Sequence, residues 1–524
     1  MKHPKGLFVL FFTEMWERFG YYLMLGIFSL YMLDAWESGG MGFSSQQKSD
    51  IYGTYIGLVY LTPFIGGILA DRILGYRKSI IIGGLLMSAG YIGLSIHDNT
   101  SFYLSLLLII LGNGFFKPNI STLVGNLYNH VAYREHKDAG FNIFYMGINV
   151  GAFICNFVAA YMRINFGWGY AFLAAGIGLL LGLFVFVLGT KHIKEADVIK
   201  PLEKGDMSTG KIFLSVVLPM FTFGILGYLI PGNLLGSDTN DAFAFGCLPV
   251  ITFFFYLWKT AHAADKKSIS ALLSVYICII VFWAVFHQNG DALTVWANNY
   301  TDREMPASMA GVASTIGLAE EVTNLGNDTD ARSAAYFRNL PSERVPEEGK
   351  SLLLVSTEIY QSVNPFWVVV LTPVIIGVFG FLNSRRKEPT TASKITIGLF
   401  ITALSALVMI GAVNSVNIAD EKASSWWLIA TYGVVTIGEL CLSPMGLSLV
   451  SKLSPPRITA LMMGGFFLST SVGNKLSGVL SGMWERYDDK TYFFLTNVLL
   501  LLVASGMMLL LLKRLNKTMK ERGV

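Results

Sequence analysis

Charged residues are scarce in this sequence. Only 14% of its 524 residues are Asp, Glu, Lys or Arg, against about 25% in soluble domains, while 53% are hydrophobic. That share, about 278 residues, is close to the 280 or so that fourteen membrane spans of roughly 20 residues would need. A formal net charge of +4 is too small to indicate a nucleic acid as partner. The composition excludes a water-soluble enzyme and predicts a polytopic membrane protein.

Cysteine is scarce as well. Each of the four cysteines lies inside an apolar run, without paired spacing: Cys155, Cys247, Cys278 and Cys441. This pattern is typical of small buried apolar side chains in helices, not of disulfides. No cluster of His and Cys indicates a metal site, and no nucleophile–base pair appears in the apolar runs. We therefore expect neither a metal, nor a cofactor, nor enzymatic activity.

Long apolar runs separated by short charged segments predict fourteen membrane-spanning helices, because lipid offers no partner to unpaired backbone groups. The predicted spans are 6–33, 49–71, 78–97, 101–129, 138–163, 169–190, 210–231, 240–260, 268–298, 351–383, 392–414, 424–453, 457–484 and 491–513. We expect the first to be an uncleaved span rather than a signal peptide, because it carries Glu14, Glu17 and Arg18 in its apolar stretch.

Charge predicts the orientation and the domains. With both termini in the cytoplasm, 26 of the 39 Lys and Arg residues fall in cytoplasmic segments and 10 in outer loops, as the positive-inside rule requires. The spans divide as six, two and six, which predicts an N-terminal bundle (1–190), linkers with two extra helices (191–267) and a C-terminal bundle (268–524). Residues 299–350 form one long outer loop, in which we expect an accessory hairpin or helix that is dispensable for the chemistry.

Five ionisable residues within the predicted apolar spans are the informative ones. They are Glu14, Glu17, Arg18, Lys117 and Glu439. If all faced lipid they would together cost about 12–18 kcal/mol, at roughly 2.5–3.5 kcal/mol each. They therefore either form ion pairs that lock helices together or line a polar cavity that binds a charged solute, and the second interpretation is favoured.

The first predicted span supports that interpretation. Its residues 14, 18, 21, 22 and 25 share one face of a helix, which carries an acid, a base and two tyrosines. Protonation of Glu14 or Glu17 would release the Arg18 guanidinium to bind another anion. The face therefore predicts a proton-dependent switch.

Six segments, in order along the chain, resemble motifs of the proton-coupled oligopeptide transporters, a branch of the major facilitator superfamily. In the first, Glu14-x-x-Glu17-Arg18-Phe-x-Tyr21-Tyr22 is similar to the family's first-helix motif. The others are residues 66–78, 112–119, 141–151, 361–365 and 438–444. The resemblance implies a major facilitator fold whose two six-helix bundles enclose a cavity that opens alternately to each side of the membrane, and the proton-driven symport of di- and tripeptides.

The resemblance also implies roles for single residues. Arg18 and Lys117 would face the peptide carboxylate, and Asn149, Asn364 and Glu439 would hold its amino group and backbone. Tyr21, Tyr22, Tyr60 and Trp283 would line pockets for its side chains. A zwitterion needs cationic donors at one end and an acid at the other, which agrees with this division. The partners expected are small peptides, protons and the bilayer of the cell inner membrane, with the chain acting as a monomer.

The sequence departs from the family at three positions. Many members carry an arginine where Leu25 stands and an acid where His287 stands, and a Trp where Phe466 stands. The Phe466 change is expected to reshape a substrate pocket. His287 is the one histidine of seven that lies well inside a predicted span rather than at its end or outside it, and Asp291 at i+4 could pair with it. His287 either only hydrogen-bonds across the bundle or replaces the missing acid as a titrating, proton-coupling group near its ordinary pKa of about 6.5.

Two further predictions complete the set. Asp71, Arg72 and Arg77 are expected to form a charged gate cluster, with Asp291 as a further gating residue. The alternatives to peptide symport are a transporter of the same fold for another small anion or zwitterion, such as nitrate or a modified amino acid, and a receptor that binds peptides without moving them. Glu439 disfavours nitrate, which has no ammonium group to neutralise it. The Glu14–Glu17–Arg18 switch disfavours the receptor.

Overall fold

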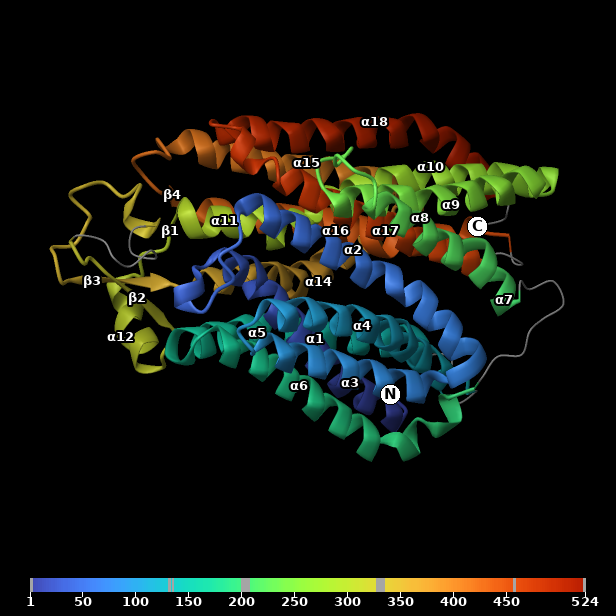
Figure 1. Ribbon diagram of the computed structural model, residues 1–524. Helices are drawn as coiled ribbons and strands as arrows, with labels where there is room; N and C mark the ends of the chain where they lie inside the picture. The colour runs from blue at the N-terminus through green and yellow to red at the C-terminus, as the bar shows by residue number, and fades with distance from the viewer. Residues whose placement is uncertain are drawn as a thin grey trace.

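The computed structural model consists of long helices that run side by side, shown in Figure 1. It describes residues 3–130, 133, 136–198, 208–326, 335–455 and 459–521. Both termini lie toward one end of the helices and the strands lie at the other (Figure 1). We call these ends the terminal side and the loop side.

The N-terminal half forms one bundle of six helices. They are α1 (Lys5–Leu33), α2 (Ser45–Leu69), α3 (Tyr76–Leu94), α4 (Asn99–Leu127), α5 (Lys137–Phe166) and α6 (Trp168–Leu188). Helix α1 packs on α5 and α6, and α3 packs on α4. One continuous cluster of buried apolar side chains fills the space between them.

The C-terminal half forms a second bundle with its own apolar core. Its helices are α10 (Ala263–Phe286), α11 (Ala292–Asn299), α14 (Val363–Ser384), α15 (Thr391–Ser415), α16 (Ser425–Leu453), α17 (Thr459–Ser481) and α18 (Lys490–Glu521). A 3-10 turn, His287–Gly290, separates α10 from α11. The predicted span 268–298 is therefore two helices with a break between them.

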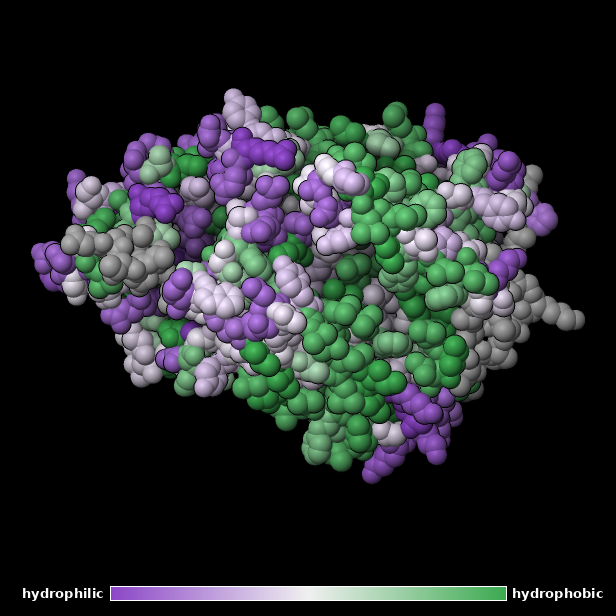
Figure 2. All heavy atoms as spheres, viewed as in Figure 1, coloured by the Kyte–Doolittle hydropathy of each residue, from purple (hydrophilic) through white to green (hydrophobic). Residues whose placement is uncertain are grey.

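A pair of helices lies outside both bundles. The pair is α8 (Leu218–Tyr228), continuous with a π-helical turn and α7 (Thr209–Ile212), and α9 (Asp238–Thr260). Apolar residues cover the middle of the molecule over α6 and α8–α9, and hydrophilic residues gather at its two ends (Figure 2). This belt is the surface that a bilayer would cover. With α10 and α11 counted as one interrupted span, the predicted architecture of two six-helix bundles and an extra helix pair is confirmed.

Eleven helices within the described residues are long and apolar enough to cross a membrane. Three of the fourteen predicted spans, which correspond to α1, α3 and α17, are not among them. In α1, charged residues interrupt the apolar stretch at positions 14, 17 and 18. The length of α1, 29 residues or about 43 Å, still exceeds the roughly 30 Å of a bilayer core. Composition alone therefore misses a helix whose charges face the protein interior.

The long loop has its own small fold, which corrects one predicted boundary. It contains α12 (Ala307–Thr315) and an antiparallel hairpin of β2 (Ala319–Thr323) and β3 (Ser351–Val355), while β1 (Thr301–Asp302) pairs in parallel with β4 (Ala423–Ser424). The expected accessory hairpin is present, but the predicted span 351–383 is wrong at its start. Residues 351–355 are a strand because Leu354 packs into the apolar core of the loop, and the helix begins at Val363.

Candidate functional site

An ion cluster lies on α1 in the interior of the N-terminal bundle. Arg18 Nη2 donates to Glu17 Oε1 at 2.6 Å, its Nε donates to Glu17 Oε2, and the same Nε lies 3.3 Å from Glu14 Oε1. None of the three side chains is more than 4% exposed. Glu14 Oε2 and the Tyr21 hydroxyl have no hydrogen-bond partner within the described residues. The cluster thus holds one guanidinium between two carboxylates and leaves acceptor sites unused.

A second cation borders the same region. Lys117, on α4, is half-buried, and its ammonium lies 3.7 Å from the centre of the Tyr60 ring on α2. This is a cation–π contact, which holds the ammonium without neutralising it. Lys117 is also close enough to Glu14 and Glu17 to act on them electrostatically. The N-terminal bundle therefore presents two cations, Arg18 and Lys117, around one space.

The C-terminal bundle contributes a carboxylate. Asn364, near the start of α14, donates through Nδ2 to Thr436 Oγ1 at 2.8 Å and to Glu439 Oε2 at 3.3 Å, both on α16. No ion pair to Glu439 is recorded among the described residues. Tyr22 of α1 is close enough to Glu439 for the two to interact electrostatically. An acid held by neutral donors therefore faces the cationic bundle.

Aromatic rings join the two halves at this level. The Tyr60 ring lies 6.5 Å from Trp283 and 5.8 Å from His287, both of the C-terminal bundle. Trp283 stacks on His287 at 5.2 Å. Within the described residues, Trp283 Nε1 and His287 Nε2 have no hydrogen-bond partner. Three predicted residues thus form one aromatic wall with unused donor or acceptor atoms.

The predicted pairing of His287 with Asp291 is wrong. Asp291 binds Lys48 of α2 in a buried ion pair instead. The i, i+4 argument fails because the helix ends at Phe286 and the 3-10 turn follows, so that the two side chains do not share a face. The His287 ring contacts the rings of Tyr60 and Trp283. Its titration stays a prediction.

Asn149 and Phe466 are buried. Asn149 Nδ2 donates to the Tyr145 carbonyl within α5 at 3.0 Å. Phe466 is 4% exposed and meets the Tyr276 ring edge-on at 6.5 Å, inside the core of the C-terminal bundle. A side chain buried in this way can affect a bound substrate only through the residues that pack on it. The binding roles of both residues stay predictions.

The predicted gate cluster is placed only in part. Arg77 Nε donates to Asp197 Oδ2 at 2.7 Å, which ties the start of α3 to the segment after α6 within one bundle. Asp71 lies half-buried in a π-helical turn, Ala70–Leu74, while the side chain of Arg72 lies outside the described residues. The sequence did not indicate Asp197 as the partner.

The two bundles are joined on the loop side. Every hydrogen bond and ion pair recorded between them within the described residues lies in the middle of the helices or toward that side. Ser29 Oγ donates to the Gly290 carbonyl at 2.7 Å, and Asn156 Nδ2 to Ser362 Oγ at 3.0 Å. A Cβ on Gly53 of α2 would lie 2.7 Å from the Gly478 Cα of α17, so this close approach requires glycine. The structure is a state closed on the loop side.

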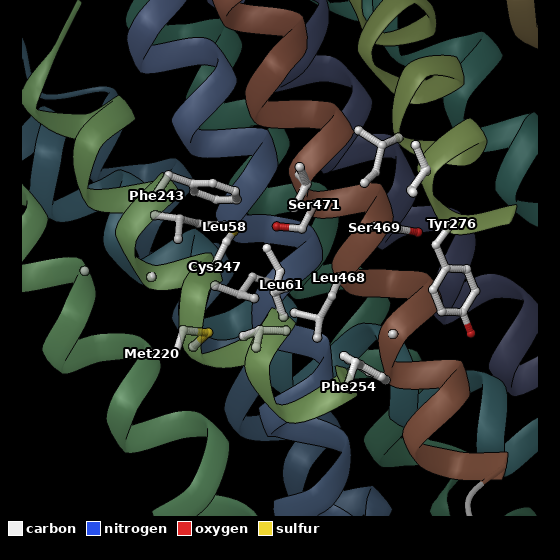
Figure 3. Close-up of a pocket in the computed structure, with 18 of the residues that line it drawn as sticks. Leu58, Leu61, Met220, Phe243, Cys247, Phe254, Tyr276, Leu468, Ser469 and Ser471 are labelled. Carbon is white, nitrogen blue, oxygen red and sulfur yellow. The ribbon is translucent and has the colours of Figure 1, made fainter. Parts of the chain in front are cut away.

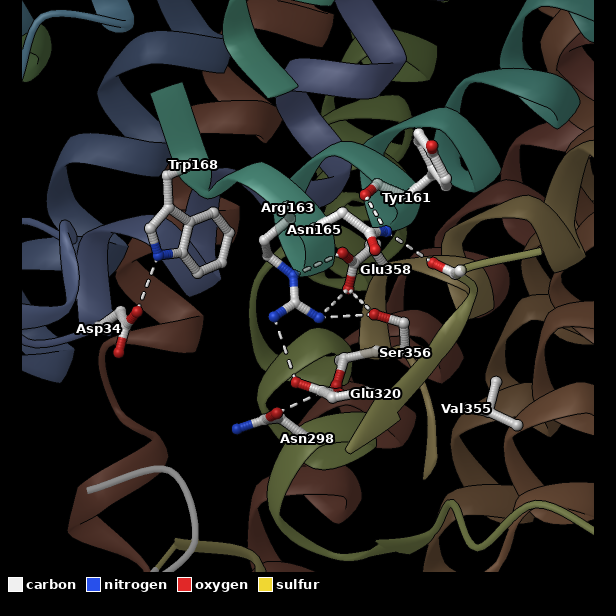
Figure 4. A network of polar contacts seen from close by, with 12 residues as sticks. Asp34, Tyr161, Arg163, Asn165, Trp168, Asn298, Glu320, Val355, Ser356 and Glu358 are labelled. Atoms are coloured by element: carbon white, nitrogen blue, oxygen red, sulfur yellow. Dashed lines mark hydrogen bonds and ion pairs between the residues drawn. The ribbon is translucent and has the colours of Figure 1, made fainter. Parts of the chain in front are cut away.

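An ion network that the sequence did not indicate strengthens this closure (Figure 4). Arg163, at the loop-side end of α5, donates to Glu358 Oε1 at 2.7 Å and to Ser356 Oγ at 2.6 Å, both just after β3. It also reaches Glu320 Oε1 on β2 at 3.2 Å. The long loop is thus bound to the N-terminal bundle through charges. Outside the loop, Lys475 Nζ on α17 also joins the two bundles, because it binds Asp50 on α2 at 2.7 Å.

The pKa of Glu320 leads to a stability prediction. Burial raises this pKa, but Arg163 and Arg303 lower it further, to about 2 against an ordinary 4.5. A depressed folded-state pKa contributes stability above pH 4.5 that is lost as pH falls toward 2. We expect Glu320→Gln to cost about 3 kcal/mol at pH 7, the equivalent of that difference in pKa.

The measurement is the unfolding temperature of purified protein as a function of pH. The difference between Glu320→Gln and wild type should be largest at neutral pH and should narrow below pH 4.5. Glu321→Gln, the exposed neighbour on the same strand, is the control and should behave as wild type. A pH-independent difference would contradict the ionic role of Glu320.

Two helical bundles, with two cations on one and an acid on the other near the aromatic contacts that join them, define a membrane transporter of the major facilitator type. The POT family model matches residues 77–314 and 347–495, and the chain belongs to that family. The predicted family is confirmed.

Curated relatives match along nearly the whole chain. The Bacillus subtilis protein named uncharacterized transporter YclF is 30% identical over 94% of this chain and 90% of its own. The di-/tripeptide transporter of Lactococcus lactis strain IL1403 is 29% identical over 94% and 92%. The dipeptide and tripeptide permease A of Escherichia coli is 27% identical over 94% and 86%.

Solved structures also match along nearly the whole chain. A peptide transporter POT in complex with sulfate has a TM-score of 0.78 at 29% identity and covers 98% of this chain and 96% of its own. A POT family transporter in complex with 5-aminolevulinic acid has a TM-score of 0.76 at 26% identity, with 98% and 97% covered. The likeness therefore extends to both bundles and the helix pair.

Proposed function

We propose that this chain moves di- and tripeptides together with protons by alternating access. The observation that carries the proposal is the charge arrangement across the bundle interface: Arg18 and Lys117 on one side, and Glu439, without a recorded cationic partner in the described residues, on the other. A peptide zwitterion carries the complementary charges at its two ends. Nitrate has no cationic end, so Glu439 disfavours it.

The binding roles follow from this arrangement. The peptide carboxylate would bind Arg18 and Lys117, and the amino group would bind Glu439 and Asn364. Asn149 would bind the peptide backbone, since an amide both donates and accepts hydrogen bonds. Aromatic side chains that accept varied shapes would contact the peptide side chains: Tyr21, Tyr22, Tyr60 and Trp283. Phe466, buried in the core of the C-terminal bundle, would shape a pocket through its packing.

Proton coupling would use the α1 cluster. Arg18 is held by both carboxylates, so a peptide carboxylate competes with them for the guanidinium. Protonation of Glu14 or Glu17 removes one competitor and frees donors for the peptide. Release of the proton restores the ion pairs and expels the carboxylate. Glu439 is a further proton-accepting group, because an ammonium and a proton would compete for it.

Alternating access requires that the loop-side contacts break. Opening toward that side would separate Arg163 from Glu358 and Lys48 from Asp291. The second pair contains Asp291, for which a gating role was predicted. Each pair is buried, so its separation must be offset by water entering the gap. The present closed state would release substrate toward the terminal side.

We further propose that the chain acts as a monomer in the cell inner membrane, with both termini in the cytoplasm. The termini lie toward the same side (Figure 1), and 26 of 39 Lys and Arg residues belong to segments assigned to that side. Uptake would then run from the loop side to the cytoplasm.

One rival keeps the same site. 5-Aminolevulinic acid, present in one of the matching structures, also carries an amino group and a carboxylate at its ends. The charges of Arg18, Lys117 and Glu439 suit it as well as a dipeptide, and so do those of other zwitterionic amino acids. A peptide differs by its backbone amide, for which Asn149 and Asn364 are the candidate partners.

Counterflow tests the proposal against both rivals. Proteoliposomes loaded with unlabelled dialanine should accumulate labelled dialanine from outside, because a transporter exchanges substrate across the membrane. Competition by 5-aminolevulinic acid and by alanine in the same assay ranks the substrates. Binding of dialanine without counterflow would instead establish a receptor, and faster exchange of 5-aminolevulinic acid than of any dipeptide would overturn the substrate class.

His287 provides a separate test of proton coupling. We expect His287→Gln to flatten the pH dependence of initial uptake between about pH 5.5 and 7.5, around the ordinary imidazole value, and to leave peptide affinity nearly unchanged. The measurement is initial rate against external pH at fixed membrane potential. An unchanged profile would leave a neutral hydrogen-bonding histidine and assign the coupling to Glu14, Glu17 and Glu439.

A further inference from the structure

A cavity of about 880 Å³ lies beside the transport site, between the extra helix pair and the helices α2, α10 and α17 (Figure 3). Its wall is almost entirely carbon. The residues labelled in Figure 3 come from five helices and line the space, among them Leu58, Met220, Cys247, Tyr276 and Leu468. Such a wall offers a peptide backbone few partners, so the cavity is not a second peptide site.

The cavity is long and open to the side. It extends from Thr239, at the loop-side end of α9, to Trp258 near the opposite end of the same helix, a rise of about 29 Å at 1.5 Å per residue. Its rim residues Ile225, Ile251 and Ile277 are 61%, 62% and 52% exposed. In a membrane this rim faces hydrocarbon, so a lipid chain can enter from the side.

Two cations lie at the terminal-side mouth. Arg514 Nη2 of α18 donates to Ser270 Oγ at 3.1 Å, and the Lys266 ammonium lies 5.9 Å from the centre of the Trp258 ring. Ser270 and Trp258 both line the cavity. Neither cation has an ion pair recorded within the described part of the chain, although the adjacent Lys267 pairs with Glu521 at 3.9 Å. An apolar cavity thus ends at two cations without recorded acidic partners.

We propose that this cavity binds one acyl chain of an anionic phospholipid, whose phosphate rests against Arg514 and Lys266. Basic side chains between membrane helices bind anionic headgroups, and an apolar cavity of this length takes a fatty chain. A zwitterionic headgroup carries an ammonium that these cations repel, so the site selects net negative lipids. The lipid belongs to the leaflet on the terminal side and fills the space that the extra helix pair encloses.

Native mass spectrometry of the full-length protein tests the headgroup. The probes are dioleoyl phosphatidylglycerol and dioleoyl phosphatidylcholine, mixed equally in detergent. Wild type should retain one phosphatidylglycerol. Arg514→Gln with Lys266→Gln should bind it roughly 25-fold less tightly, at about fivefold for each basic side chain lost near the membrane surface. Lys513→Gln with Lys267→Gln removes the same charge from neighbouring exposed positions and should bind as wild type.

A second pair of variants tests the chain. Cys247→Trp places an indole in the cavity and should abolish retention. Leu248→Trp adds the same group at the next residue, which is 47% exposed and outside the cavity, and should retain the lipid. Equal retention of both lipids, equal loss in both charge pairs, or retention by Cys247→Trp would overturn the proposal. If the spectrum instead showed a dimer of the chain without bound lipid, the cavity would be covered by a second copy, and the proposal would be wrong.

Discussion

Replacement of Glu439 by glutamine should reduce dipeptide uptake about 10- to 100-fold. Glutamine keeps the shape and the hydrogen bond from Asn364 but removes the charge that the proposed function assigns to the peptide ammonium. A hydrogen bond to a charged group is worth about 1.5–3 kcal/mol. Loss of that free energy from substrate binding lowers the uptake rate at low peptide concentration by about 10- to 100-fold. The measurement is initial uptake of labelled dialanine into proteoliposomes.

An amino-blocked dipeptide separates lost recognition from lost folding. Acetyl-dialanine carries no ammonium, so it should bind wild type weakly and should be little affected by Glu439→Gln. Glu421→Gln, at an exposed position beyond the loop-side end of α15, is the matched control and should leave both substrates unaffected. Wild-type uptake of dialanine by the Glu439 variant would contradict the assignment.

Replacement of Arg18 by lysine should abolish concentrative uptake, although it conserves charge. Arg18 contacts Glu17 with two nitrogens and approaches Glu14 with one of them. An ammonium lacks the planar fork that holds two carboxylates and still offers donors to a third. We expect accumulation under a pH gradient to fall at least tenfold, toward the level without a gradient, while counterflow exchange is retained.

Arg344→Lys is the matched control for this substitution. Arg344 also pairs with two acids, Asp302 and Glu304, but at an exposed position of the long loop, away from the bundle interface. The control should concentrate peptide as wild type does. If Arg18→Lys concentrates peptide equally well, the switch between Glu14, Glu17 and Arg18 does not couple protons to transport.

The sequence predicted what local periodicity and motif spacing encode. Along α1, the helix period places Glu14 one turn before Arg18, and the structure joins them. The sequence also predicted a polar surrounding for Lys117 and Glu439, because ionisable residues in apolar helices need one. The sequence predicted fourteen spans because lipid permits only helices of that length, and eleven helices in the described residues are long and apolar enough to cross a membrane.

The sequence missed contacts between distant segments. Arg163 and Glu358 are 195 residues apart, and nothing in the local sequence around either one indicates the other. Lys48 and Asp291 are 243 residues apart. No local pattern specifies such pairs, because they depend on how the two bundles meet. Periodicity was also wrong where the helix breaks, as between His287 and Asp291.

The leucines of β3 are a second case in which a contact between distant segments decides the structure. Ser351–Val355 is as apolar as a span and adjoins one, so hydropathy alone extends the helix through it. Its pairing with β2 decides otherwise, since the register brings Leu354 opposite Glu320 and buries Leu354 in the loop core. The pairing also positions Glu320 for Arg163.

Concentrative uptake is the most direct test of the central claim. Proteoliposomes that contain the full chain and an outside-acid pH gradient, without a substrate gradient, should accumulate labelled dialanine above its external concentration. A protonophore that collapses the gradient should return the internal level to the external one. Accumulation that is indifferent to the gradient, or equilibration without accumulation while the gradient persists, would contradict proton-driven peptide symport.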